Sequence, residues 1–173
     1  METVGPAASG DLFSKAIKAV LWGLLGILIY MTWRFNLKYA ICGVVAVLHD
    51  VLIALGLFAL TGRELSIVAI SAVLTVIGYS INDTIVIFDR IREDLKLMRK
   101  VPFKDIVNLA VNQTLSRTIL TSLTVFIVVA SLYIFGGPVI NDFAFIMLVG
   151  VFTGTFSTVY VASALMVDWS GHR

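Results

Sequence analysis

Residues 78–90 read GYSINDTIVIFDR and place an amide and a carboxylate, Asn82 and Asp83, in a run that is otherwise apolar. The run starts at Ser66 and is long and apolar enough to cross a lipid bilayer. A lone carboxylate in hydrocarbon costs several kcal/mol unless it is protonated, paired or hydrated. We therefore expect a membrane-spanning helix whose Asp83 faces the interior of a bundle, which makes Asp83 the first candidate functional residue.

The composition of the whole chain is that of an integral membrane protein. Of its 173 residues 59% are hydrophobic and 14% are charged, with a mean hydropathy of +0.98. A soluble domain has roughly half apolar and a quarter charged residues. The apolar residues form continuous blocks, which favours helices over a β-barrel. We expect an all-α membrane protein with a bundle of five transmembrane helices.

The apolar blocks predict five spans, at about residues 14–33, 39–60, 65–88, 119–135 and 143–167. The lead-in before the first span is interpreted as irregular, because Pro6 and the glycines beside it break regular elements. The chain then divides into a lead-in, a transmembrane bundle that includes an amphipathic connection, and a short tail, at residues 1–13, 14–167 (connection 89–116) and 168–173.

Lysine and arginine gather on one side of the predicted spans. The turn after the first span, the connection and the C-terminus hold most of them: Arg34, Lys38, Arg90, Arg92, Lys96, Arg99, Lys100, Lys104 and Arg173. The other side holds Lys15, Lys18 and Arg63. Because basic residues favour the cytoplasmic side, we expect the N-terminus outside and the connection and C-terminus in the cytoplasm.

Asp83 has two interpretations. It lies seven residues before Arg90, which puts it about 10 Å inside the boundary if Arg90 marks that level. It could be a permanent polar contact between helices. Alternatively it binds and releases protons, since burial favours the neutral carboxyl group and an approaching cation favours the charged one. Arg117 is the candidate cation, although an arginine at the end of a span often serves as a snorkelling anchor. Asn82 and Thr121 are candidate supporting hydrogen-bond partners.

His49 and Asp50 form a second polar pair, near the middle of the second predicted span. Ionisable groups at such a depth are rare and usually face inward. A proton relay and a hydrogen-bonded pair that joins two helices explain these residues equally well. One His and one Asp do not make a metal shell, so we expect neither metal nor cofactor. We also expect neither enzymatic catalysis nor nucleic-acid binding.

Several motifs resemble the SecF family, the smaller membrane subunit of the SecDF protein-export complex in the resistance-nodulation-division superfamily. The resemblance rests on residues 78–93, 48–51, 113–118 and 135–138 and on the start, 2–6, in the family's order. It implies that the family's proton-coupling carboxylate falls on Asp83 and its intramembrane arginine on Arg117. SecF proteins also have a first transmembrane helix and a periplasmic domain that are not seen here. The chain is therefore interpreted as the five-helix remainder of a six-helix subunit, with residues 1–13 as the tail of the missing domain.

The resemblance also implies partners and a function. SecD would supply the other half of a pseudo-twofold bundle, and the SecYEG channel and YajC would contact the complex in the cytoplasmic membrane of a bacterium or archaeon. Proton influx would help to export polypeptides, which the missing parts would capture. Two alternatives remain open: a structural subunit that braces SecD and the channel, and a small-molecule/proton antiporter.

Overall fold

The computed structural model describes residues 6–170, and the side chains of residues 13–169. The described part is helical except for short turns and contains no strand. The helices follow one another as α1 (Pro6–Arg34), α2 (Leu37–Leu60), α3 (Ile67–Leu97), α4 (Phe103–Phe135), α5 (Gly137–Phe156), the π-helix η1 (Ser157–Ala162) and α6 (Ser163–Ser170). The last three form one continuous rod.

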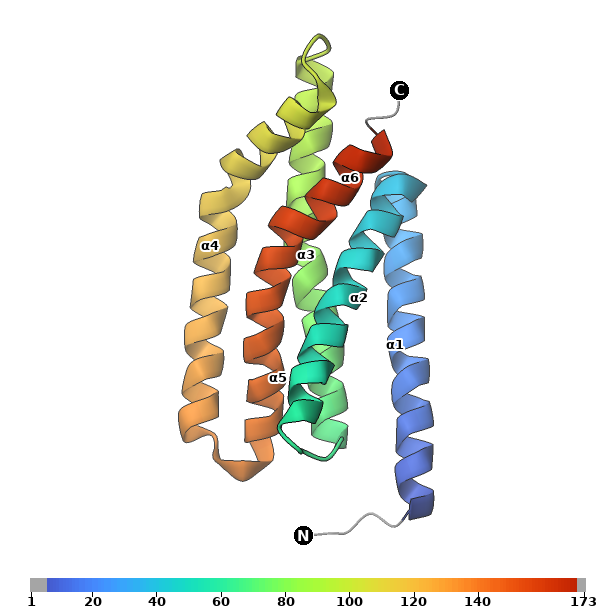
Figure 1. The fold of residues 1–173 in the computed structure, drawn as a ribbon, viewed down its shortest axis with the longest axis vertical. Coiled ribbons are helices and arrows are strands. Elements are labelled where there is room, and N and C mark those ends of the chain that lie inside the picture. Colours follow the sequence, from blue (N-terminus) through green and yellow to red (C-terminus); the bar gives the residue numbers. More distant parts are fainter. Residues whose placement is uncertain (1–5, 171–173) are drawn as a thin grey trace.

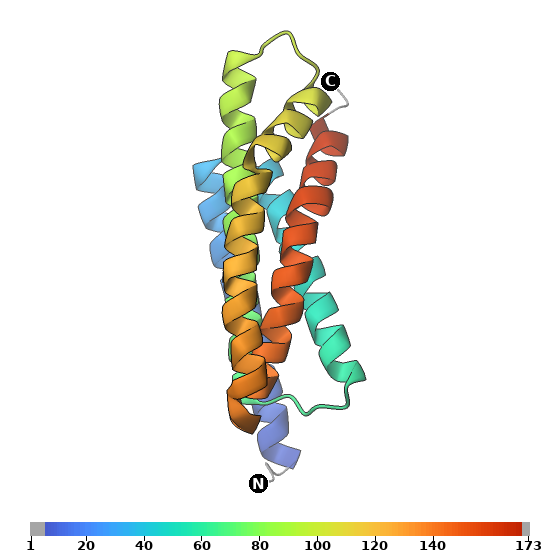
Figure 2. The same ribbon diagram turned by 90° about the vertical axis from the view of Figure 1, so that its left-hand side faces the viewer.

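The described helices therefore form five rods, and each is long and apolar enough to cross a membrane, which confirms the predicted fold class. They cover Phe13–Arg34, Leu37–Leu60, Ile67–Leu97, Phe103–Phe135 and Gly137–Trp169. Rods that follow one another along the chain run in opposite directions, so the packed pair α3 and α5 run in the same direction (Figure 1). The α1–α2 turn, the α3–α4 turn and the C-terminal end of α6 lie at one end of the bundle, which we call the basic end. The α3–α4 turn projects beyond the others there (Figure 2).

The prediction of an irregular lead-in is wrong for residues 6–13, because α1 already begins at Pro6. Proline lacks an N–H that the first turn of a helix does not use, so Pro6 starts the helix instead of breaking it. Residues 1–5 lie outside the described part. Likewise, α5 begins at Gly137, with Pro138 in its first turn, several residues before the predicted position 143. Gly62 and Gly137 both have positive φ, +69° and +74°, in the turns at the end opposite the basic end.

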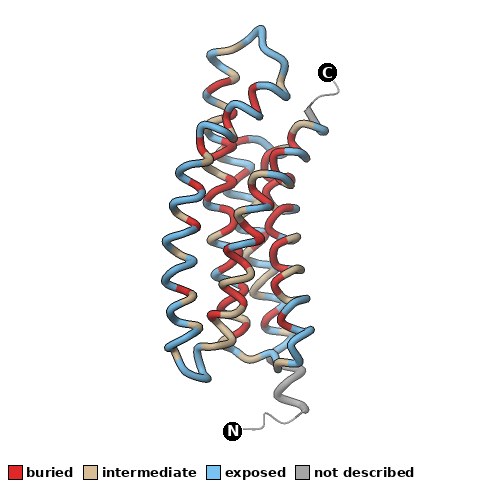
Figure 3. The backbone as a smooth tube through the Cα atoms, turned by 60° about the vertical axis from the view of Figure 1, so that its left-hand side comes forward, coloured by how far each residue is buried: buried red, intermediate tan, exposed pale blue. Residues whose placement is uncertain are grey.

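The core lies among α2, α3 and the α5–η1–α6 rod, while α1 and α4 flank it. Buried positions run through the middle of the bundle, whereas most of α4 is exposed (Figure 3). Most of the buried residues of α4 form a narrow stripe at four-residue spacing, Ile106, Ala110, Thr114, Thr118 and Ser122. One side of α4 therefore faces the bundle and the rest faces outward.

A close contact in the core joins α5 to α3. Helix α5 carries two glycines four residues apart, Gly150 and Gly154, and both are buried. A Cβ atom on Gly150 would lie 2.7 Å from Cγ1 of Val76, and one on Gly154 would lie 3.4 Å from Cβ of Ser80. Small residues let two membrane helices approach closely. The glycine pair therefore serves packing within the chain.

We expect Gly150→Ala to destabilise the bundle by about 1–3 kcal/mol, because Val76 fills the space that the new methyl group needs. Gly56→Ala is the matched control, since a Cβ atom at that helical glycine would meet nothing within 4 Å. Thermal unfolding in detergent measures both. Equal melting temperatures for the two variants would contradict the close α3–α5 contact.

Candidate functional site

Asp83 lies on the inward side of α3, as predicted. The residue is only 4% exposed and lies near the middle of the spanning helix. Its Oδ2 atom is enclosed and has no hydrogen-bond partner among the described residues. Burying a polar atom without a hydrogen-bond partner costs free energy, so Asp83 destabilises the fold of this chain. Asp83 is therefore a candidate site of proton exchange or of contact with a partner protein.

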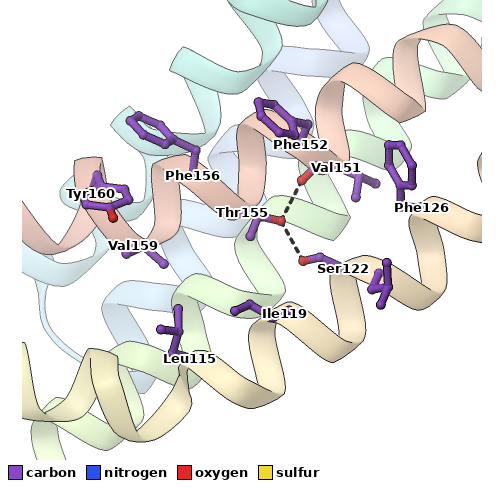
Figure 4. Close-up of a pocket in the computed structure, with 11 residues that line it drawn as sticks. Leu115, Ile119, Ser122, Phe126, Val151, Phe152, Thr155, Phe156, Val159 and Tyr160 are labelled. Atoms are coloured by element: carbon purple, nitrogen blue, oxygen red, sulfur yellow. Dashed lines mark hydrogen bonds between the residues drawn. The ribbon is translucent and has the colours of Figure 1, made fainter.

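Two hydrogen bonds between side chains define the register of α3 against the antiparallel α4. Tyr79 Oη donates to Ser122 Oγ at 3.0 Å, and Arg90 Nε donates to Gln113 Oε1. Ser122 Oγ lies 2.6 Å from Oγ1 of Thr155, so the first bond continues to α5 (Figure 4). Asp83 lies between these two links, one helical turn from Tyr79 toward the basic end.

The register places Thr118 level with Asp83. Thr118 is one turn before Ser122 on α4, as Asp83 is one turn after Tyr79 on α3. Thr118 is fully buried, and its Oγ1 atom also has no hydrogen-bond partner among the described residues. Two facing helices thus each carry one unpartnered buried polar group at the same level. Sequence reasoning missed Thr118, although the four-residue stripe of small and hydroxyl side chains on α4 is a signal that could have indicated it.

The predicted partners of Asp83 are only partly brought together. The charge of Arg117 acts on Asp83, but none of the described carboxylates forms an ion pair with this arginine, whose side chain is exposed on α4. Asn82 is exposed on the opposite side of α3 from the core. Thr121 is half-buried and donates to the backbone oxygen of Arg117 at 2.9 Å. In this chain, Asn82 and Thr121 therefore do not support Asp83 through hydrogen bonds.

Asp50 is the centre of a second polar cluster, where α2, α3 and η1 meet. The residue is fully buried. Its Oδ2 atom accepts from Ser80 Oγ at 2.5 Å and from Ser157 Oγ at 2.7 Å, and its Oδ1 atom lies 3.0 Å from His49 Nδ1. A carboxylate with partners on three sides is a well-satisfied buried group. Of the two interpretations of this pair, the geometry favours one that joins helices.

The helix that carries Ser157 widens at this cluster. Residues Ser157–Ala162 form a π-helix, a rare element that often accompanies functional positions. Thr158 Oγ1 lies 3.2 Å from Thr84 Oγ1 and donates to the backbone oxygen of Gly154 at 2.8 Å. Hydroxyl groups from α3 and η1 thus hold the widened turn beside Asp50.

We expect Asp50→Ala to lower the free energy of unfolding by at least about 2 kcal/mol, because Ser80 and Ser157 lose their buried acceptor. Asp89→Ala is the control, since it breaks only the exposed ion pair with Arg34, which is worth at most about 1 kcal/mol. The measurement is thermal unfolding in detergent. A loss from Asp50→Ala no larger than that of the control would contradict the proposed role in joining helices.

An apolar groove runs between α4 and α5 on the outer side of the bundle. It has a volume of about 520 Å³, and its walls include Ile119, Phe126, Phe152 and Tyr160 (Figure 4). Ser122 and Thr155 lie at the base of the groove, between it and the hydrogen bond from Tyr79 to Ser122. Within the described part of the chain, no three His, Cys, Asp or Glu side chains are grouped so that they could hold a metal ion.

The fold and the site together define a class, the multi-pass helical membrane proteins that keep ionisable side chains inside their bundle. The family model described as "Protein export membrane protein SecD/SecF, C-terminal" matches residues 1–172. The chain therefore belongs to the SecD/SecF C-terminal family, which confirms the resemblance found in its motifs.

Known relatives agree with this assignment. The protein translocase subunit SecF of Desulfurispirillum indicum is 51% identical over 172 residues, which cover 98% of this chain and 55% of that protein. The protein translocase subunit SecDF of Thermus thermophilus is 49% identical over 172 residues, covering 99% of this chain and 23% of that protein. The chain thus spans about half the length of the SecF relative and less than a quarter of SecDF.

Solved structures show the same fold. The crystal structure of SecDF from Thermus thermophilus superimposes with a TM-score of 0.92 at 48% identity, covering 97% of this chain and 23% of that one. A crystal structure of SecDF in a super-membrane-facing form gives a TM-score of 0.87 at 48% identity, covering 94% of this chain and 22% of that one. The arrangement of the five rods described above is therefore that of the corresponding part of SecDF.

Proposed function

We propose that this chain is part of a proton-coupled auxiliary subunit of the Sec protein translocase, which assists the export of polypeptides across a membrane. The observation that best supports the proposal is the buried environment of the Asp83 side chain. It is a carboxyl group buried within a spanning helix, its Oδ2 atom lacks a partner, and the charge of Arg117 acts on it without an ion pair. The relatives are named as translocase subunits SecF and SecDF, which supports the export function.

The coupling follows from the chemistry of a buried acid. A carboxyl group in an enclosed site favours its neutral form, whereas an approaching guanidinium group favours its charged form. Arg117 lies on an exposed surface of α4, so its distance from Asp83 can change without repacking the core. Protonation from one side of the membrane and release to the other would then accompany a movement of α4 relative to α3. We propose no enzymatic step.

The orientation in the membrane follows from the basic residues. The basic end holds Arg34, whose Nη2 atom lies 2.8 Å from Asp89 Oδ1, and Arg92, which donates to the backbone oxygen of Arg34. Arg63 lies at the opposite end, bound to Asn141 and Asp142. The positive-inside rule supports a cytoplasmic basic end and an outer N-terminus, in the cytoplasmic membrane of a bacterium or archaeon.

The exposed surfaces indicate that the chain works in a larger assembly. An arginine on the outer face of a membrane helix is costly in lipid, so Arg117 needs a protein surface or water beside it. We propose that the related half, SecD, covers this side of the bundle. The SecYEG channel and YajC are further proposed partners, as is the exported polypeptide through regions beyond this chain.

A structural role is the second candidate function. The specific observation in its favour is the Asp50 cluster, in which a buried carboxylate of α2 accepts hydrogen bonds from Ser80 of α3 and Ser157 of η1. If Asp83 has the same role, it would find its partner on SecD and form a permanent contact. An antiporter for small molecules has no comparable support in the described residues.

The experiment is Asp83→Asn in the full-length subunit, assembled with its partners in vesicles. We expect the variant to lose the part of polypeptide export that depends on an imposed proton gradient, at least about tenfold, because an amide cannot exchange the proton. Export measured without a gradient should stay unchanged.

Asp142→Asn is the matched control, because Asp142 is a half-buried carboxylate of the same bundle at its outer end, paired with Arg63. It should keep its gradient dependence. Gradient-driven export by the Asp83 variant at the normal rate would refute proton coupling. Loss of the assembled complex would instead support the structural role.

A further inference from the structure

We infer that Thr118 is the positioning residue of Asp83: its hydroxyl group forms the hydrogen bond that holds the Asp83 carboxyl group during the proton cycle. The inference rests on the proposed proton coupling and deepens it by naming a second residue of the same site. It starts from two atoms, Oδ2 of Asp83 and Oγ1 of Thr118, which are both buried and both without a hydrogen-bond partner among the described residues.

Buried polar atoms without a partner are rare, because each costs free energy that a hydrogen bond would recover. All three such side-chain atoms found in the described part of the chain lie on α3 and α4, and two of them, on Asp83 and Thr118, lie at the same level of the bundle. The hydrogen bonds from Tyr79 to Ser122 and from Arg90 to Gln113 lie on either side of Asp83 along α3 and fix the register of the two helices there. A hydrogen bond between Asp83 and Thr118 would therefore satisfy both atoms.

The direction of each side chain agrees with this pairing. Thr118 belongs to the buried stripe of α4, one turn from Ser122, whose hydroxyl already bonds across to α3. Asp83 is one turn from Tyr79, the residue that makes this bond. Arg117 precedes Thr118 but has an exposed side chain, so of these two neighbours only Thr118 belongs to the buried stripe of α4.

A hydroxyl group suits an acid that changes its protonation state. It can donate to a carboxylate and can accept from a neutral carboxylic acid, so a single residue can bond to Asp83 before and after proton uptake. A small shift of α4 toward α3 would close this bond. The ionisable groups around Asp83 are Tyr79, on the preceding turn of α3, and Arg117 on α4, while α5 contributes Thr155, which does not titrate.

The test compares Thr118→Val with Thr118→Ser in the full-length subunit, assembled with its partners in vesicles. Valine keeps the shape and removes the hydroxyl group, whereas serine keeps the hydroxyl group. We expect Thr118→Val to reduce gradient-driven export about tenfold and to displace its pH midpoint by about one unit, since one hydrogen bond to a charged group has about that effect. Thr118→Ser should restore both quantities.

Thr121→Val is the matched control, because Thr121 lies on the same helix and its hydroxyl group bonds only to a backbone oxygen of that helix, that of Arg117. It should leave gradient-driven export unchanged. The melting temperature of Thr118→Val should equal or exceed that of the unmodified protein, because the lost hydroxyl group has no partner in the state described.

Normal export by Thr118→Val, beside a defective Asp83→Asn, would overturn this inference and leave the proposed function standing. Normal export by both variants would overturn both. A lower melting temperature for Thr118→Val, or failure of Thr118→Ser to restore export, would assign Thr118 to packing and would also overturn the inference.

Discussion

The structure depends on the cost of placing a carboxyl group inside a membrane-spanning bundle. Asp83 is almost completely buried and its Oδ2 atom has no partner among the described residues. A group of this kind is tolerated only where surrounding protein keeps lipid away and where protonation, a cation or a hydrogen bond can relieve the cost. The packing of α4 against α3 contributes to the enclosure, and we propose that Arg117 and Thr118 relieve the cost.

The core combines a firmly bonded polar cluster with two buried polar atoms that have no partner among the described residues, on Asp83 and Thr118. In the cluster, Ser80 and Ser157 hold Asp50, and Gly150 packs directly on Val76. Helix α4 is mostly exposed and is linked to α3 and α5 through Ser122. The proton-driven movement that we propose would shift α4 at these contacts while α3 and the α5–η1 rod stay together.

The sequence predicts the number of spans and the inward direction of Asp83, because hydrophobic blocks and the cost of a buried charge act locally along the chain. It does not predict Thr118, because the register between α3 and α4 depends on bonds such as that from Tyr79 to Ser122. Asn82 was expected beside Asp83, yet neighbours in sequence point to different sides of a helix. The absence of an ion pair between Asp83 and Arg117 likewise depends on geometry that spacing alone cannot supply.

The central claim is that Asp83 exchanges a proton within the bundle. Infrared difference spectroscopy of the assembled complex tests it most directly, because the carbonyl stretch of a neutral carboxylic acid is distinct from the bands of a carboxylate. The claim predicts a neutral-acid band that appears and disappears as the pH is changed and that is missing from Asp83→Asn. A spectrum in which the substitution removes no such band at any pH at which the complex stays folded would contradict it.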